Sequence, residues 1–181
     1  MAGYQDYFPA LVGGVLALKG IEGDIVINQL FSKELKDVLE KNVALVYSGQ
    51  SRASGINNWE VYKGFFDKRT EVMEGLANIA RISHETYEAI HRKDWKQMLS
   101  LIGLEGEERE KLFPNITTDK IRDLASALRS QGHAVGLKMC GAGGGGCFIL
   151  IHNGMNLEAL DGLILRCNMR RLDFKVESPL T

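Results

Sequence analysis

The sequence lacks a strong excess of charge of either sign. Its 181 residues include 22 Lys and Arg against 23 Asp and Glu, so the formal net charge is −1. A chain with this balance has no basic field that could hold a nucleic-acid backbone. We therefore expect no nucleic-acid partner.

Long apolar runs are absent as well. No stretch reaches the roughly 18 consecutive apolar residues that a membrane-spanning helix needs. The opening Met1-Ala2-Gly3-Tyr4 also lacks the basic and then apolar pattern of a signal peptide. We expect a cytoplasmic protein without a membrane partner.

Cysteine is scarce. The three cysteines are Cys140, Cys147 and Cys167, an odd count without a CxxC pair. This pattern argues against both a disulfide framework and a zinc site. We expect reduced thiols in the core or in loops, and we name no metal ligand.

What is present is the composition of an ordinary globular chain. With 45% hydrophobic and 25% charged residues, the sequence can bury one sizeable core, and we expect a single domain over 1–181.

Local residue patterns predict the secondary structure. They predict strands near 15–18, 25–27, 43–47, 134–138, 147–151 and 172–176. They predict helices over 33–41 and 59–93, the second with a break near 82–83, and further helices starting at 95, 119 and 156. The charged run 105–111 is expected to be a solvated connection. Because strands and helices are mixed without strict βαβ alternation, the predicted class is α+β, an antiparallel sheet with helices packed on it.

A glycine-rich segment is the most informative local feature. Gly141-Ala142-Gly143-Gly144-Gly145-Gly146 contains five glycines in six positions, a density that loses backbone entropy and offers no side chain for packing. Successive N–H groups in such a turn can bind an anion, although a tight structural turn is the alternative. The formal GxGxxG match is misleading, because a strand-like run follows where a dinucleotide fingerprint opens a helix. A Walker loop is excluded because Lys138 precedes the glycines.

Three segments resemble one kinase family. Lys138 to Cys147 looks like the third conserved motif of the GHMP kinases. The opening Gly3 to Gly14 resembles the segment that carries the catalytic aspartate in the sugar-kinase branch, especially the heptose-7-phosphate kinases and their fucokinase relatives. Val46 to Arg52 resembles a further segment of that branch. The resemblance implies the ferredoxin-like C-terminal domain of these enzymes and transfer of the ATP γ-phosphate to a hydroxyl of a sugar or sugar phosphate.

Members of this family place an ATP-binding PxxGLGSS-type loop on an N-terminal domain before the aspartate. Here the matching aspartate is Asp6. We therefore expect that the N-terminal half is absent and that the chain is inactive by itself. The missing half would be a partner in cis or in trans, and a homodimer is also possible. ATP and Mg²⁺ are the implied cofactors, but their main ligands would lie outside this chain.

The resemblance assigns roles to individual residues. Asp6 would accept the proton of the sugar hydroxyl or orient that hydroxyl, and its alternative role is an N-cap of a helix that begins at Tyr7. Gln5, Tyr7 and Arg52 would contact the substrate, Arg52 through its planar donors, unless it is only a surface residue.

For the loop, Gly141, Ala142, Gly143, Gly144, Gly145 and Gly146 would supply N–H groups near the phosphates or brace the absent ATP loop, with Lys138 as a nearby positive charge. The competing hypothesis is a non-catalytic module that keeps the fold and binds a metabolite. Because such a module needs no base aimed at a hydroxyl, Asp6 together with the glycine loop favours the enzyme.

Overall fold

The computed structural model describes residues 4–51, 57–113, 115–141 and 143–180, so Arg52 and Ala142 lie outside the described residues. The chain divides into two compact units. The first consists of Met1–Lys41 with Phe174–Thr181, and the second of Asn42–Asp173. Within the described ranges, no helix is long and apolar enough to cross a membrane.

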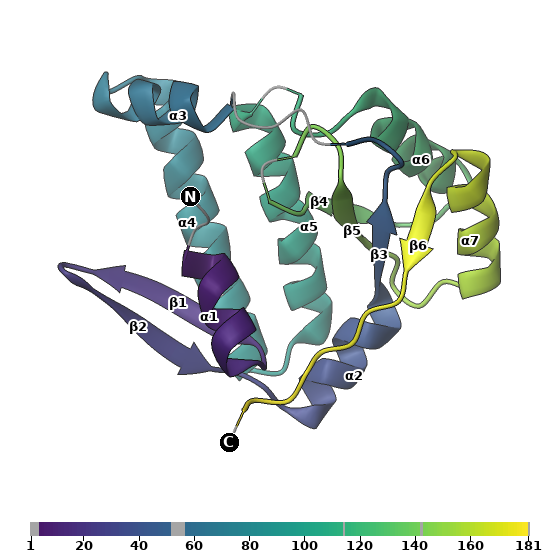
Figure 1. Ribbon diagram of the computed structural model, residues 1–181, viewed down its shortest axis with the longest axis horizontal. Helices are drawn as coiled ribbons and strands as arrows, with labels where there is room; N and C mark the ends of the chain where they lie inside the picture. Colours follow the sequence, from purple (N-terminus) through teal and green to yellow (C-terminus); the bar gives the residue numbers. More distant parts are fainter. Residues whose placement is uncertain (1–3, 52–56, 114, 142, 181) are drawn as a thin grey trace. The chain divides into compact units, whose positions relative to one another are not determined.

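The first unit is built around a β-hairpin (Figure 1). It begins with α1 (Tyr4–Val12), continues through β1 (Leu16–Ile21) and β2 (Asp24–Gln29), and enters α2 (Lys33–Asn42). The two strands were predicted near 15–18 and 25–27, and they pair antiparallel. The helix predicted over 33–41 is confirmed as α2. The Ser32 hydroxyl before it accepts a hydrogen bond from the Leu35 amide at 3.1 Å.

The C-terminal segment returns to this first unit. The amide of Gly14 donates to the carbonyl of Glu177 at 3.1 Å, and the amide of Leu180 donates to the carbonyl of Val12 at 2.8 Å. The strand predicted over 172–176 is therefore misplaced, since the observed strand is β6 (Arg170–Leu172). Val176 donates its amide to the Glu40 carboxylate at 2.8 Å instead of to a neighbouring strand.

The second unit contains a four-stranded antiparallel sheet in the order β4-β5-β3-β6. Its other strands are β3 (Val43–Tyr47), β4 (Gly136–Met139) and β5 (Cys147–Ile151). One face packs against α6 (Asp119–Ser130) and α7 (Leu157–Arg166), as Figure 1 shows. The α+β prediction with an antiparallel sheet is confirmed.

The core lies between this face and its two helices. The inward positions of α6 are all buried, namely Ile121, Leu124, Ala125 and Leu128. They meet the alternate residues of the strands, among them Val46, Phe148 and Leu150, which are fully buried. Asn156 caps α7, since its side-chain oxygen accepts from the Glu158 amide at 2.8 Å.

Three further helices precede α6: α3 (Asn57–Phe66), α4 (Thr70–His91) and α5 (Trp95–Leu112). The break predicted near Ile82 and Ser83 is wrong, because α4 runs through that point. The Ser83 hydroxyl donates to the Ile79 carbonyl at 2.8 Å, so it is satisfied inside the helix. The break lies before Thr70, where Lys68 adopts a left-handed conformation with φ of 55°.

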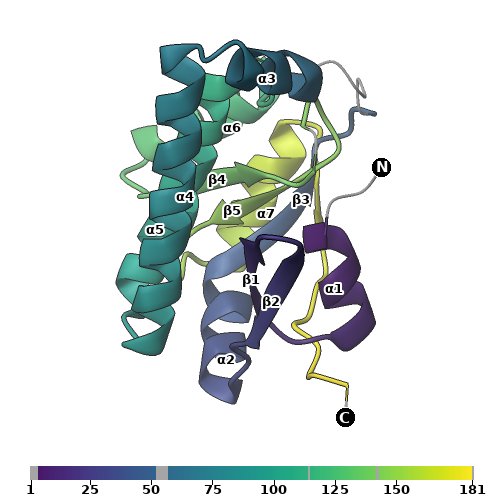
Figure 2. The same cartoon turned by 90° about the vertical axis from the view of Figure 1, so that its left-hand side faces the viewer.

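The end of α5 also differs from expectation. The helix starts at Trp95 as predicted, and Asp94 caps it by accepting from the Gln97 amide at 3.0 Å. The helix does not end before the charged run, however, but continues to Leu112 (Figure 2). The prediction of a solvated connection over 105–111 is therefore wrong. The charged side chains of this run are not simply solvated, because several of them have partners within the fold. Glu105 pairs with Lys138, and Arg109 donates to the Gly141 carbonyl, so two of these partners lie at the glycine loop.

Candidate functional site

The glycine loop connects β4 to β5. All five of its glycines have positive φ, with values of 67° at Gly141, 77° at Gly143, 71° at Gly144, 126° at Gly145 and 75° at Gly146. Only glycine adopts this region without a steric penalty. The loop leads directly into a strand, which confirms that the formal GxGxxG match does not open a helix.

One side of the loop packs closely against the segment before α6. The Gly144 amide donates to the Ile116 carbonyl at 2.8 Å. A Cβ atom at Gly143 would lie 2.8 Å from that same carbonyl oxygen. A side chain cannot be accommodated there, so close backbone approach accounts for glycine at position 143.

The other side packs against the end of β3. The Gly146 amide donates to the Gln50 carbonyl at 2.9 Å, and the Ser48 amide donates to the Gly146 carbonyl at 2.9 Å. A Cβ atom at Gly145 would lie 3.0 Å from the Ser51 carbonyl oxygen. The residues Ser48 to Ser51, which precede Arg52, therefore lie beside the glycine loop.

These contacts leave part of the loop available. Within the described part of the chain, the amides of Gly141, Gly143 and Gly145 donate to no backbone carbonyl. Consecutive left-handed residues with unengaged N–H groups can form an anion-binding concavity. The arrangement is thus a braced loop in which alternate amides can serve a ligand.

Helix α5 contributes two charged residues to the base of the loop. Arg109 donates to the Met139 carbonyl at 3.4 Å and to the Gly141 carbonyl at 3.1 Å. The Glu105 carboxylate forms an ion pair with Lys138 and lies 4.0 Å from the Arg109 Nε atom. Burial lowers the pKa of Lys138, and the negative charge of Glu105 opposes this shift. The ammonium group of Lys138 is therefore directed to Glu105.

Sequence reasoning missed Glu105 and Arg109 because it treated their segment as solvated. The i, i+4 spacing of opposite charges is typical of a helix, and it was a usable signal. A second signal was the pair Gly103 and Gly106, which brings α5 against β4. A Cβ atom at Gly106 would lie 2.9 Å from the Leu137 carbonyl carbon.

Another missed residue is Lys120, in the first turn of α6. Its ammonium group donates to the Ser48 carbonyl at 3.0 Å and to the Asn168 carbonyl at 2.9 Å. A Cβ atom at Gly49 would lie 3.4 Å from this ammonium nitrogen. Lys120 therefore holds together two segments that flank the loop's contact with β3.

The predicted catalytic residue lies in the first unit. Gln5, Asp6 and Tyr7 are exposed residues in the first turn of α1. Because α1 begins at Tyr4, Asp6 is the third helical residue, and its alternative role as N-cap of a helix starting at Tyr7 is wrong. The glycine loop belongs to the second unit. Ala142 and Arg52 are outside the described residues.

Elsewhere in the second unit there is a cavity of about 640 Å³ formed by residues of α3, α4 and α5. Its charged lining consists of Glu60, Glu71, Glu74 and Glu108 with the two cations Arg69 and Lys111. Both cations already pair with carboxylates of the same lining. An excess of carboxylates disfavours a polyphosphate here. Within the described ranges, no cluster of His, Cys, Asp or Glu is arranged to hold a metal ion.

Comparisons with known proteins agree with the fold. Residues 86–160 match the family model described as GHMP kinases C terminal. A sequence comparison with curated proteins gave no match. The matched segment contains α5, β4, the glycine loop and β5.

Solved structures of similar fold include a candidate sugar kinase from Campylobacter jejuni, with 18% identity and a TM-score of 0.67 over 98% of this chain and 49% of that one. A mevalonate kinase from L. major, in complex with R-mevalonate, has 16% identity and a TM-score of 0.66 over 88% of this chain and 48% of that one. A phosphomevalonate kinase from Streptococcus pneumoniae, in complex with phosphomevalonate and AMPPNP, has 17% identity and a TM-score of 0.56 over 82% of this chain and 42% of that one. The chain thus spans about half the length of these proteins, and its fold is that of the GHMP kinase C-terminal domain.

Proposed function

We propose that this chain is the C-terminal half of a GHMP-type kinase that transfers the γ-phosphate of ATP to a hydroxyl of a sugar or sugar phosphate. The observation that carries the proposal is the glycine loop, whose five left-handed glycines lie inside the segment that matches the family. A loop that is braced on two sides and keeps unengaged amides suits the approach of a phosphate group.

Phosphoryl transfer requires mainly alignment of the acceptor oxygen and neutralisation of charge on the transferring group. Asp6 is the proposed base, because it is exposed and lies inside α1 instead of at the N-cap of a helix that begins at Tyr7. Gln5, Tyr7 and Arg52 are proposed to contact the acceptor. The amides of Gly141, Gly143 and Gly145 are proposed to face the phosphates.

We propose that Lys138 supports the glycine loop and does not contact the phosphate directly. Its ammonium group pairs with Glu105, and Arg109 of the same helix donates to the loop carbonyl of Gly141. We assign Lys138 and Arg109 to holding the loop in place against α5. Mg²⁺ would neutralise ATP phosphates in the complete enzyme, with ligands from the N-terminal half.

The sugar-kinase assignment rests on the motif around Asp6 and on the segment before Arg52. Enzymes that act on mevalonate and phosphomevalonate share the fold, so the acceptor class is the part of the proposal that an assay must decide. The proposed partner is the N-terminal half, in the same chain or as a separate subunit, within the cytoplasm.

The test has two arms. Calorimetric titration of the isolated chain with Mg-ATP is expected to show no tight binding, because the ATP-binding half is not part of it. A dissociation constant on the order of 1 μM would show a complete nucleotide site and overturn the half-enzyme assignment. In the second arm, the chain is joined to or coexpressed with its N-terminal half, and transfer of labelled phosphate is compared between sugars, sugar phosphates and mevalonate.

The competing function, a metabolite-binding module without catalysis, predicts a different result in that second arm. A sugar would then bind to the completed protein, but no labelled phosphate would reach it. Transfer to mevalonate and to no sugar would keep the kinase and refute the sugar branch.

A further inference from the structure

Cys140 and Cys147 stand at the two ends of the glycine loop on facing strands. The register of β4 and β5 pairs Met139 with Phe148. One position further along, the Cys140 amide donates to the Cys147 carbonyl at 3.0 Å. The two cysteines therefore oppose each other directly at the base of the loop.

The ladder places both cysteines on the same face of the sheet, because the bond from the Cys140 amide to the Cys147 carbonyl continues the pairing one residue beyond the end of β4. Successive residues of a strand alternate between its faces, and Met139 and Phe148 belong to the core formed with α6 and α7. Cys140 and Cys147 consequently share the opposite face with Lys138, whose partner Glu105 lies on α5. Both cysteines are thiols of intermediate exposure, so a small oxidant can reach them.

The spacing of such a pair suits a disulfide. Directly opposed residues that are hydrogen-bonded in an antiparallel ladder have Cα atoms about 5.5 Å apart, which falls within the range of about 4.4–6.8 Å found across disulfides. The Cβ atoms must approach by roughly 1 Å. Gly141 and Gly146 adjoin the two cysteines, and the conformational freedom of glycine allows this small movement.

Two cationic side chains lie close to Cys140. Arg109 donates to the Gly141 carbonyl, next to Cys140. Lys138, whose ion pair is with Glu105, also interacts electrostatically with Cys140. The thiolate is the nucleophile in thiol oxidation.

We infer that Cys140 and Cys147 form a reversible redox pair, which a peroxide converts to a disulfide that ties together the two ends of the glycine loop. The thiolate of one cysteine attacks a peroxide oxygen, the O–O bond breaks, and a sulfenic acid and one water form. The second thiolate attacks the sulfenic sulfur, and a second water leaves. Two thiols and one hydrogen peroxide thus give one disulfide and two waters, with the sulfurs oxidised and the peroxide reduced.

The sequence offers a direct assay. One tryptic peptide, Met139–Arg166, contains both Cys140 and Cys147, and the peptide Cys167–Arg170 contains the third cysteine. The full chain is treated with hydrogen peroxide, its free thiols are alkylated after denaturation, and the digest is analysed by mass spectrometry. The first peptide is expected without alkylation and lighter by two hydrogens, the second with one alkyl group, and dithiothreitol before alkylation should restore both sites in the first.

Serine variants separate this pair from general oxidation. Cys140→Ser and Cys147→Ser should each abolish the internal disulfide, and Cys167→Ser should leave it unchanged. Hydrogen exchange of the loop amides should slow on oxidation in the wild type and in Cys167→Ser only.

Three results would overturn the inference. The first is full alkylation of Met139–Arg166 after peroxide treatment. The second is a mass gain of two oxygens that dithiothreitol does not reverse. The third is a bridge to Cys167 or to another chain.

Discussion

Asp6 is an exposed residue of α1, so its side chain is not part of a packed core. It lies in the first turn of the helix, where a negative charge interacts favourably with the helix dipole. In the kinase that we propose, completed with its N-terminal half, Asp6→Asn is expected to lower turnover by roughly 10²–10⁴-fold, because asparagine lacks the basicity of the carboxylate. The thermal midpoint should change little. Turnover and thermal melting of the same preparation are the two measurements.

The matched control is Asp37→Asn, an exposed aspartate on α2. It removes the same charge and should leave turnover at the wild-type value. Near-normal turnover of Asp6→Asn would remove that residue from the mechanism, together with the main residue-level support for phosphotransfer.

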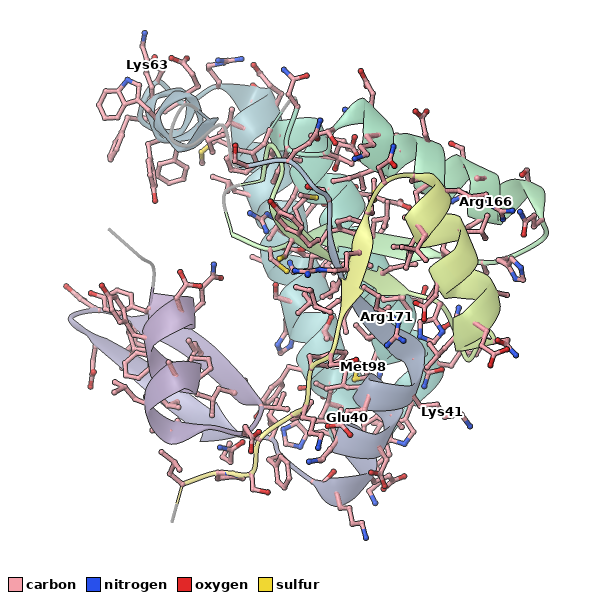
Figure 3. The ribbon with its side chains drawn as sticks, turned by 45° about the vertical axis from the view of Figure 1, so that its right-hand side comes forward. Glu40, Lys41, Lys63, Met98, Arg166 and Arg171 are labelled. Carbon is pink, nitrogen blue, oxygen red and sulfur yellow. The ribbon has the colours of Figure 1, made fainter. Side chains whose placement is uncertain are left out.

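His152 is a buried histidine at the end of β5 with 3% of its surface exposed. Within the described part of the chain, neither ring nitrogen has a hydrogen-bond partner. Burial lowers the pKa of His152, and the positive charge of Arg171 lowers it further, while a backbone hydrogen bond acts in the opposite direction. Arg171 lies on β6 (Figure 3) and is paired with Asp161 of α7 at 2.6 Å. The ring is therefore neutral in the folded protein at neutral pH.

This burial predicts a pH dependence of stability. The unfolded chain binds a proton at His152 below about pH 6.5, where the folded protein does not. The free energy of unfolding is therefore highest above that pH and falls as the pH decreases toward the lowered pKa of the folded state. Urea unfolding at pH 7.5 and at pH 5.5 measures this loss.

Variants identify the group that is responsible. His152→Leu should remove this part of the pH dependence, since leucine needs no hydrogen bond and binds no proton. His84→Leu, at an exposed position of α4, should retain it. An unchanged pH dependence in His152→Leu would assign the effect to other residues.

At the scale of elements, α5 approaches β4 closely because glycine at position 106 has no side chain. Gly106 lies inside the helix, where alanine normally stabilises by about 0.5–1 kcal/mol. Here a Cβ atom would lie 3.1 Å from the Lys138 Cα and closer still to the Leu137 carbonyl group. Gly106→Ala is therefore expected to destabilise the protein, by roughly 1–3 kcal/mol, because the helix must move away from the strand.

Gly162 of α7 provides the matched control, since a Cβ atom there would meet nothing within 4 Å. Gly162→Ala should stabilise by about 0.5–1 kcal/mol. Urea unfolding of both variants measures their free energies of unfolding. A higher free energy of unfolding for Gly106→Ala would show that close packing of α5 against β4 does not require glycine at position 106.

At the scale of the whole molecule, aromatic side chains on α3 are unusually exposed. Trp59, Tyr62 and Phe66 have 67%, 60% and 78% of their surface accessible. Contiguous apolar surface of this kind marks interaction sites. The isolated chain is expected to self-associate with increasing concentration and to bind a dye that reports apolar surface, as measured by analytical ultracentrifugation and fluorescence.

The double variant Tyr62→Ser, Phe66→Ser should lower both signals. Leu165→Ser removes one exposed apolar residue on α7, 64% accessible, and should lower neither. A strictly monomeric wild-type chain without dye binding would count against an unpartnered half-enzyme.

The sequence by itself determined the features that depend on local periodicity and local chemistry. The continuous apolar run of β5, the four inward positions of α6 and the helix starts at Asp94 and Asn156 follow from neighbours within a few residues. The glycine loop was identified for the same reason, because its density of glycine implies backbone positions that other residues avoid. These patterns sufficed for the α+β class and for the position of the glycine loop.

Only the tertiary structure decided where charges and breaks lie. From the sequence alone, the charged run from Glu105 to Lys111 is typical of a solvated segment. The partners of its charges, Lys138 and the Gly141 carbonyl, are more than 25 residues away in sequence. Ser83 looks like a helix start, but its hydroxyl bonds back into the helix that continues through it. The opposition of Cys140 and Cys147 likewise depends on the register between two strands. A local pattern specifies what a residue prefers, whereas its partner is set by packing between segments that are distant in sequence.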